Sequence, residues 1–146
     1  MLEDIKKILA EHKPEPIGEQ RYFSVLLPLI RVDGALHVLY EVRGEHISQP
    51  GDTSFPGGAV EAGESFEETA IRETMEELNI KRDNINILGE MDYIMNERAI
   101  IHCYVGEIVG VDKDDIRFNK EVQEIFTVPL QYFMDNRPTY YSSKVR

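Results

Sequence analysis

Three glutamates are spaced so that they share one side of a helix. Glu73, Glu76 and Glu77 stand at positions i, i+3 and i+4 within the stretch 65–78, and residues at this spacing face the same direction on an α-helix. The three carboxylates repel one another, and they lie in the last turn, where the helix dipole disfavours negative charge. A solvated charged face, relieved by Arg72, is one interpretation. A bound Mg²⁺ or Mn²⁺ is the other, because hard divalent cations prefer oxygen ligands and would remove the repulsion.

A glycine-rich segment leads into this stretch. Phe55, Pro56, Gly57 and Gly58 are consecutive, and Glu64 follows six residues later. Two adjacent glycines allow the main chain to approach a ligand or metal closely and to offer it a carbonyl or N–H group. Many turns look like this, so the segment supports a binding site only together with the carboxylates.

The carboxylates are predicted to lie on a helix with recognisable ends. Ser65 is a typical N-cap residue, and Glu68, three residues on, completes a capping box. The helix is expected to continue to Leu78, and Asn79 tolerates the left-handed conformation that ends many helices. The apolar side chains on the side opposite the glutamates are Ile71, Met75 and Leu78.

Strands are expected before and after this helix, because β-branched and aromatic residues are concentrated there. The predicted strands are 21–32, 35–43, 85–94, 99–109 and 121–128. Pro28 suggests an edge position or a bulge in the first strand, and Asp33-Gly34 predicts a hairpin turn. An irregular loop is expected over 44–63, an amphipathic helix over 2–12, and a short helix from Pro129. This order predicts an α/β or α+β fold in sandwich-like layers.

The overall charge is strongly acidic. The 146 residues include 27 Asp and Glu against 16 Lys and Arg, which gives a net charge of −11. Such a surface argues against a nucleic-acid binder that uses basic side chains and against a basic membrane-surface protein. The sequence shows no signal-peptide pattern and no run of the roughly 18 apolar residues that a membrane helix needs. We therefore expect a single soluble, cytoplasmic domain over 1–146.

The segment GGAVEAGESFEETAIRETMEELNI resembles the Nudix box, which would span residues 58–80. The pattern is G, five residues, E, seven residues, R-E, an aliphatic residue, any residue, E-E, any residue, G and an aliphatic residue. The matching positions are Gly58, Glu64, Arg72, Glu73, Glu76, Glu77 and Ile80. Thr74 stands where an aliphatic residue is usual and Asn79 where glycine is usual, and neither is a ligand position.

This resemblance implies a Nudix fold, an α/β/α sandwich around a mixed sheet that carries the box as a loop–helix–loop. It also implies hydrolysis of a nucleoside diphosphate linked to another moiety, with Mg²⁺ or Mn²⁺ as the cofactor. The implied metal ligands are Glu73, Glu76, Glu77 and the carbonyl of Gly57. Arg72 and Glu64 would orient these carboxylates through charge-assisted hydrogen bonds.

The implied reaction also needs a base that takes the proton of the attacking water. We favour Glu76 for this role. In parts of the family the base lies on a later loop, and Glu121 or Glu124 would then serve. Ordinary surface charge is the other interpretation of these two residues.

The segment before the box resembles the coenzyme A pyrophosphatase branch of the family. That branch carries L-L-T-x-R, a small residue, a spacer with a second Arg, and then G-x-x-x-F-P-G-G. The matching positions are Leu39, Arg43, Gly51, Phe55, Pro56, Gly57 and Gly58. Ile47 or Ser48 occupies the second basic position, and the spacer is about one residue short. The downstream segment EVQEIFTVPLQYF also resembles this branch.

The branch resemblance implies that coenzyme A or acyl-CoA is cleaved to 3′,5′-ADP and (acyl)phosphopantetheine. Arg43 would contact a substrate phosphate, and Phe55 and Gly58 would also line the substrate site. An ADP-ribose or nucleotide-sugar pyrophosphatase is the alternative, and a nucleotide-sensing module without catalysis is a third. The expected partner is a small nucleotide diphosphate, and a homodimer is compatible with the family. Branch members often extend further, so the end at Arg146 indicates a short or truncated member.

Overall fold

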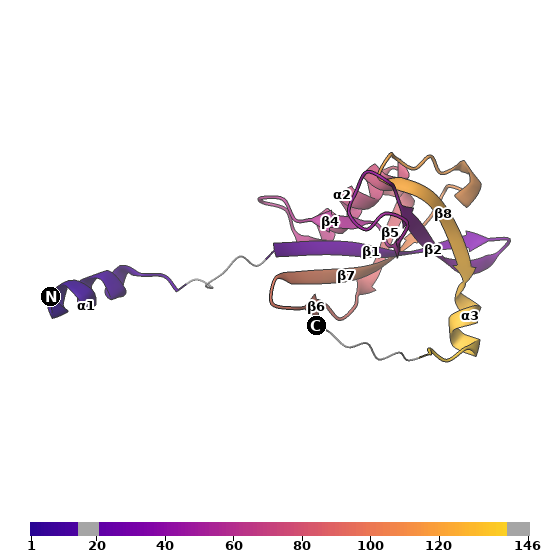
Figure 1. Cartoon of the computed structure of the whole chain (residues 1–146). Helices are drawn as coiled ribbons and strands as arrows, with labels where there is room; N and C mark the ends of the chain where they lie inside the picture. The colour runs from indigo at the N-terminus through magenta and orange to yellow at the C-terminus, as the bar shows by residue number, and fades with distance from the viewer. Residues whose placement is uncertain (15–20, 140–146) are drawn as a thin grey trace.

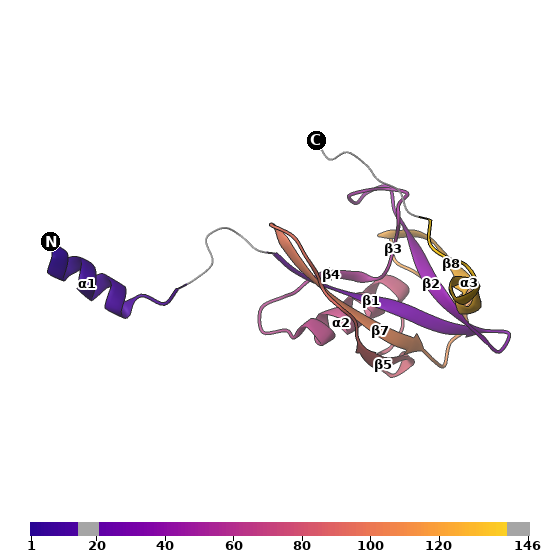
Figure 2. The same cartoon turned by 90° about the horizontal axis from the view of Figure 1, so that it is seen from below.

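The strands of the chain form one mixed sheet, shown from two directions in Figures 1 and 2. The computed structural model describes residues 1–14 and 21–139. The strands are β1 (Arg21–Val32), β2 (Ala35–Arg43), β3 (Thr53–Ser54), β4 (Gly57–Ala59), β5 (Ile85–Glu90), β6 (Ile94–Met95), β7 (Ala99–Ile108) and β8 (Val122–Pro129). The main order is β3-β2-β1-β7-β5, with β4 paired to β1, β6 to β7 and β8 to β2.

The centre of the sheet is the pair β1 and β7. These strands run parallel along their length, whereas the other pairings are antiparallel. The β1–β2 hairpin turns at Asp33 and Gly34, which both have positive φ, as a tight two-residue turn requires. The predicted boundaries of the first two strands, 21–32 and 35–43, are confirmed.

The expectation that Pro28 marks an edge or a bulge is wrong. Pro28 is buried in β1, which lies between β2 and β7. One side of β1 pairs with β7. The opposite side pairs with β4 through residues 23–25 and with β2 through residues 29–32. Pro28 falls between these two partners, so its missing N–H removes no bond from either ladder.

Two further expectations about the strands need correction. The loop expected over 44–63 contains the short strands β3 and β4, which pair with β2 and β1. The strand expected over 85–94 is broken into β5 and β6. Glu90 faces Tyr104 and Ile94 faces Ile101 on β7, so three residues oppose two across the break, and the extra residue interrupts the ladder.

Helices flank the sheet, as predicted for the Nudix fold. Helix α2 (Phe66–Leu78) packs against β1, β4 and β7, and α3 (Leu130–Asp135) contacts β2 and β8. Two short 3₁₀ turns are η1 (Arg82–Asn84) and η2 (Lys113–Asp115). The predicted N-terminal helix is present as α1 (Leu2–Glu11), and none of its residues is buried.

The hydrophobic core holds α2 against one face of the sheet. Ala70, Ile71 and Leu78 of the helix belong to the same buried cluster as Leu26 of β1 and Leu39 of β2. Burial of such side chains contributes roughly 1.5–3 kcal/mol each relative to exposure. The core therefore fixes the position of the helix that carries the predicted cation ligands.

Candidate active site

Helix α2 begins and ends where the sequence predicts. The Ser65 side chain accepts a hydrogen bond from the backbone N–H of Glu68 at 3.1 Å. A full capping box also needs a hydrogen bond from the Ser65 N–H to the Glu68 side chain. Among the described residues only the first of these two bonds forms. Asn79 adopts the left-handed conformation, with φ 50° and ψ 48°. The helix thus starts directly after the glycine-rich segment, and its last turns carry the glutamates.

The three predicted cation ligands of α2, Glu73, Glu76 and Glu77, do not form a solvated face. The side chain of Glu73 is 15% exposed, and Glu77 as a residue is 7% exposed, whereas the side chain of Glu76 is 54% exposed. Burial raises the pKa of Glu73, and the neighbouring Arg72 lowers it by a smaller amount. The solvated-face interpretation therefore fits Glu76 alone.

Arg72 joins the loop and the helix through several carboxylates. Its Nε and Nη2 donate to the two oxygens of Glu64 at 2.7 and 3.0 Å, and its Nη1 donates to Glu73 at 2.9 Å. The Thr69 hydroxyl also donates to Glu64, at 2.5 Å. The hydrogen bonds from Arg72 and then Thr69 lower the pKa of Glu64 to about 2. This bidentate arrangement holds Glu64 and Glu73 in one orientation.

Glu77 lies against the glycine-rich segment. Its Oε2 accepts a hydrogen bond from the Gly57 N–H at 3.0 Å, and its backbone carbonyl accepts one from Asn119 at 2.9 Å. Burial raises the pKa of Glu77, and the nearby carboxylate of Glu41 raises it further. The structure thus places Gly57 beside a predicted ligand through its N–H, and a role for its carbonyl stays a prediction.

Gly58 lets β4 pass close to the helix. A Cβ atom added at Gly58 would lie 2.5 Å from Oε1 of Glu73, which is closer than real Cβ contacts come. The adjacent position is equally restricted, since a Cβ atom at Gly57 would lie 2.6 Å from the Ser24 carbonyl oxygen. Both glycines are therefore needed for the approach of β4 to β1 and to the Glu73 carboxylate.

The Gly58→Ala substitution is expected to displace the Glu73 carboxylate. Because misplacement of a reacting geometry by about 1 Å costs on the order of 100-fold in rate, we expect kcat for diphosphate hydrolysis to fall by about that factor. Steady-state kinetics check this. Gly89→Ala is the matched control, since its added Cβ meets open space. Equal activity of the two variants would contradict the packing argument.

The predicted substrate residue Arg43 is engaged by its own loop. Its Nε donates to the Ser48 carbonyl at 2.7 Å and its Nη2 donates to the Ser48 hydroxyl at 3.1 Å. Ser48 is one of the two residues, Ile47 or Ser48, that correspond to the second basic position of the related branch, and it is a partner of Arg43. Two of the five guanidinium N–H groups are used in this way, and within residues 1–14 and 21–139 the other three make no hydrogen bond and could contact a phosphate.

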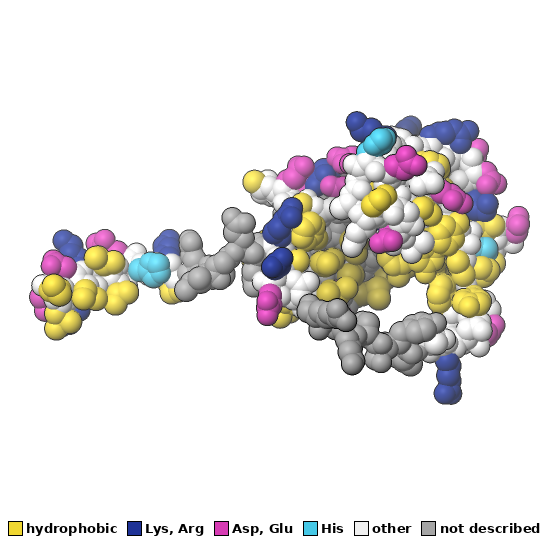
Figure 3. All heavy atoms as spheres, viewed as in Figure 1, with side chains coloured by type: hydrophobic (Ala, Val, Ile, Leu, Met, Phe, Trp, Pro, Cys, Tyr) yellow, Lys and Arg dark blue, Asp and Glu magenta, His cyan; other side chains and the backbone are white. Residues whose placement is uncertain are grey.

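The predicted substrate residue Phe55 belongs to an aromatic row that the sequence did not indicate. Tyr40 stacks on Phe55 with ring centroids 5.0 Å apart and on Phe126 at 5.2 Å. Tyr40 and Phe126 are partners across β2 and β8. Their neighbour Leu39 faces the core with α2, so the row lies on the opposite face of the sheet. Figure 3 shows hydrophobic side chains gathered over β8 and α3.

The two alternatives for a base on a later loop are separated by the structure. The carboxylate of Glu121 raises the pKa of both Glu41 and Glu73, which places its charge near the α2 carboxylates. Glu124 lies opposite Val42 in the β2–β8 pairing and is exposed. Of these two, Glu121 is therefore the one positioned near the candidate site.

The chemistry of these side chains fits a hard divalent cation. Glu73 and Glu77 supply carboxylate oxygens from one helix, and burial penalises their charge, which a cation would offset. In the described ranges 1–14 and 21–139, however, no three or more acidic, His or Cys side chains already surround a common point. Arg72 holds Glu73 in its present position, so cation binding requires side-chain rotation.

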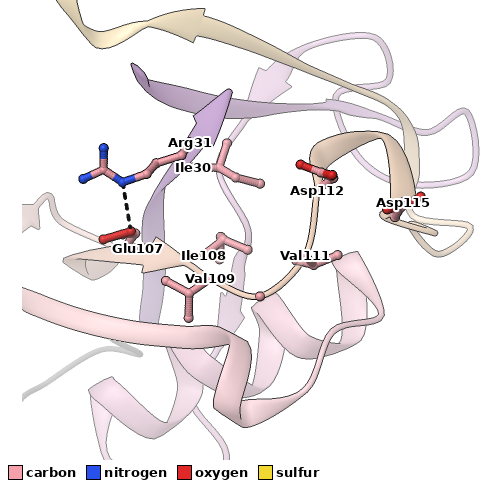
Figure 4. A pocket seen from close by; sticks show the side chains of 9 residues that line it. Ile30, Arg31, Glu107, Ile108, Val109, Val111, Asp112 and Asp115 are labelled. Atoms are coloured by element: carbon pink, nitrogen blue, oxygen red, sulfur yellow. Dashed lines mark ion pairs between the residues drawn. The ribbon is translucent and has the colours of Figure 1, made fainter. Parts of the chain in front are cut away.

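A separate pocket lies where β1 and β7 end (Figure 4). Its lining includes Ile30, Arg31, Glu107, Asp112 and Asp115. Arg31 points toward Glu107, with 3.9 Å between Nε and a carboxylate oxygen. None of the predicted site residues lines this pocket, so it is not the candidate active site.

A mixed sheet with a carboxylate-bearing helix behind a glycine-rich turn defines the Nudix class of fold. A model of the NUDIX domain matches residues 20–143. The chain is 33% identical over 139 residues to Nudix hydrolase 3 of Caenorhabditis elegans, and this alignment covers 88% of this chain and 57% of that protein. It is 30% identical over 131 residues to peroxisomal coenzyme A diphosphatase NUDT7 of Mus musculus, which covers 84% and 52%. The chain therefore belongs to the NUDIX family.

Solved structures agree with this fold. The crystal structure of a Caenorhabditis elegans Ap4A hydrolase binary complex superposes with a TM-score of 0.63 at 22% identity, covering 75% of this chain and 80% of that chain. The chain spans about half the length of the first two curated relatives, 57% and 52%. Within the described part of the chain, no helix combines the length and the apolar character needed to cross a membrane.

Proposed function

We propose that the chain hydrolyses a nucleoside diphosphate linked to another moiety, with Mg²⁺ or Mn²⁺ held by Glu73, Glu76 and Glu77. The observation that carries this proposal is the arrangement of α2, in which Arg72 fixes Glu64 and Glu73 beside the buried Glu77. In the reaction, water adds to one phosphorus, the P–O–P bond breaks, and two phosphate monoesters leave.

Each residue has a distinct part in this proposal. A bound cation would supply neutralisation of the diphosphate and a more acidic water. Glu76 is the most exposed of the three glutamates, and its contact with Arg72 is long, 3.4 Å, so it is the carboxylate least committed to the protein. It takes the proton of the attacking water, with Glu121 as the alternative base. Arg72 and Glu64 keep the ligands aligned.

The proposed substrate is coenzyme A or an acyl derivative. Two observations support it: the resemblance of the segment before the box, and the similarity to the mouse relative, a coenzyme A diphosphatase. Phe55 adjoins the glycine-rich segment of this site, but its aromatic row with Tyr40 and Phe126 lies on the face of the sheet away from α2. The name of that relative also places it in the peroxisome, so a cytoplasmic location for this chain stays a prediction.

A substrate panel tests this proposal. The purified chain is incubated with Mg²⁺ or Mn²⁺ and coenzyme A, acetyl-CoA, ADP-ribose or a nucleotide sugar, and the products are identified by mass spectrometry. We expect 3′,5′-ADP and phosphopantetheine from coenzyme A. Turnover of ADP-ribose without coenzyme A would overturn the substrate assignment, and binding without turnover of any compound would indicate a sensing module.

Dephospho-coenzyme A provides a matched probe for Arg43, because it lacks only the 3′-phosphate. If Arg43 contacts that phosphate, the wild-type chain prefers coenzyme A and the Arg43→Gln variant loses the preference. Arg31→Gln is the control, since Arg31 lies in the pocket at the far end of β1.

A further inference from the structure

One acidic residue of the sheet interior has a role in none of the patterns described above. Glu41 lies near the end of β2, two residues before Arg43, and is 2% exposed. Among the described residues, its Oε2 has no hydrogen-bond partner. A buried polar atom without a partner costs roughly 1–3 kcal/mol, and more if it is charged, so the fold retains this carboxyl group at a cost.

The surroundings of Glu41 are those of the candidate cation site. Its carboxyl group lies within hydrogen-bonding distance of the Glu77 carboxyl group. Leu39, two residues earlier and therefore on the same side of β2, is in the core with α2, so Glu41 also faces the helix. The charges of Glu73 and Glu121 act on it as well.

The balance of charge around Glu41 is negative. Arg43 is the cationic side chain that acts on it, but that guanidinium is hydrogen-bonded to Ser48. Glu41 is almost fully buried, so water does not offset its charge. Two adjacent buried carboxyl groups, one with an unpartnered oxygen, are poorly accommodated by the protein alone, and a divalent cation would offset both.

We propose that Glu41 is a further carboxylate ligand of the divalent cation, contributed by β2 and opposite Glu77. This inference rests on the proposed cation site of α2 and extends it by a residue outside the box. Glu77 would keep its hydrogen bond from the Gly57 N–H, and both Glu41 and Glu77 would supply carboxylate oxygens to the cation.

Metal binding without substrate tests the proposal. Mn²⁺ is titrated into the chain and free Mn²⁺ is measured by electron paramagnetic resonance. We expect Glu41→Gln to weaken Mn²⁺ binding by at least about tenfold, the lower end of the range for residues that support a metal site. Glu97→Gln is the matched control, because it removes the same charge from an exposed position in the β6–β7 turn. Equal Mn²⁺ affinity of the two variants would overturn the proposal.

A third variant separates this proposal from the function proposed above. If Glu73→Gln weakens Mn²⁺ binding and Glu41→Gln does not, the role of Glu41 alone is refuted. If neither variant changes the affinity, the cation site of α2 and the role of Glu41 are both refuted. Absence of coenzyme A turnover, with Mn²⁺ affinities as expected, refutes only the substrate.

Thermal unfolding separates a ligand from a structural residue. In EDTA, Glu41→Gln is expected to melt at or above the temperature of the wild type, because a buried repulsion is removed. With saturating Mn²⁺, the wild type gains more stability than the variant, since a ligand that binds the folded state stabilises it. An equal loss of stability in EDTA and in Mn²⁺ would show a purely structural role and would overturn the proposal.

Discussion

Glu77→Gln is expected to lower kcat/KM for diphosphate hydrolysis by about 10²- to 10⁴-fold, because loss of a metal ligand removes several kcal/mol of charge stabilisation. The glutamine retains an oxygen that accepts the Gly57 N–H, so the position of the glycine-rich segment is preserved. Steady-state kinetics at several Mg²⁺ concentrations check the change. A variant that folds and keeps activity within threefold of the wild type would refute the assignment of Glu77, that factor being well below the loss expected.

The same substitution is expected to stabilise the metal-free chain. Glu77 is 7% exposed and lies beside Glu41, and a buried carboxylate pair without a cation costs free energy. Glutamine has the shape of glutamic acid but carries no charge, so it avoids the cost of burying a second carboxylate beside Glu41. Urea unfolding in EDTA should therefore show an unchanged or higher free energy of unfolding for Glu77→Gln, whereas Glu97→Gln should leave it unchanged.

Arg72→Ala is expected to affect both stability and activity. Its guanidinium makes charged hydrogen bonds to Glu64 and Glu73 and is 24% exposed. We expect a loss of about 2 kcal/mol in the free energy of unfolding, below the value for a fully buried pair because solvent screens the charges. Arg72→Lys keeps the charge but cannot form the bidentate bond, so it should recover part of the stability while kcat stays low. Full recovery of kcat by Arg72→Lys would contradict an orienting role.

The stability effect of Arg72→Ala should depend on pH in a defined direction. Arg72 and Thr69 lower the pKa of Glu64 to about 2, against about 4.3 in an unfolded chain. The contribution of ionised Glu64 is therefore complete above the unfolded value and is lost as the pH falls toward 2. The difference in unfolding free energy between wild type and Arg72→Ala should shrink between about pH 5 and pH 2. A difference that is constant over this range would exclude the ion pair as its source.

The helix and its loop could be predicted closely because their signals are local. Ser65 and Asn79 mark the two ends of α2 through capping preferences that involve only neighbouring residues. Glu64, Arg72 and Glu73 stand at the spacing of the Nudix box. In the structure Arg72 donates hydrogen bonds to both glutamates. Local patterns of this kind are readable without knowing what packs against them.

Features that depend on distant partners could not be predicted in the same way. Glu41 stands in a strand pattern that gives no reason to single it out. Its proximity to Glu77 arises only when α2 packs on the sheet that contains β2. The row of Tyr40, Phe55 and Phe126 likewise joins three segments. The break between β5 and β6 depends on register against β7, which composition does not specify.

The segment between β3 and β4 has a length that the sheet determines. Thr53 and Ser54 pair with β2, and residues 57–59 pair with β1, so only Phe55 and Pro56 connect two ladders. An inserted residue there would shift one ladder by one position and turn its side chains to the other face. By contrast, residues 45–50 are mostly exposed and lie outside the strands. A change of length is therefore less costly in this loop than between β3 and β4, where it would alter the position of the glycine-rich segment relative to α2.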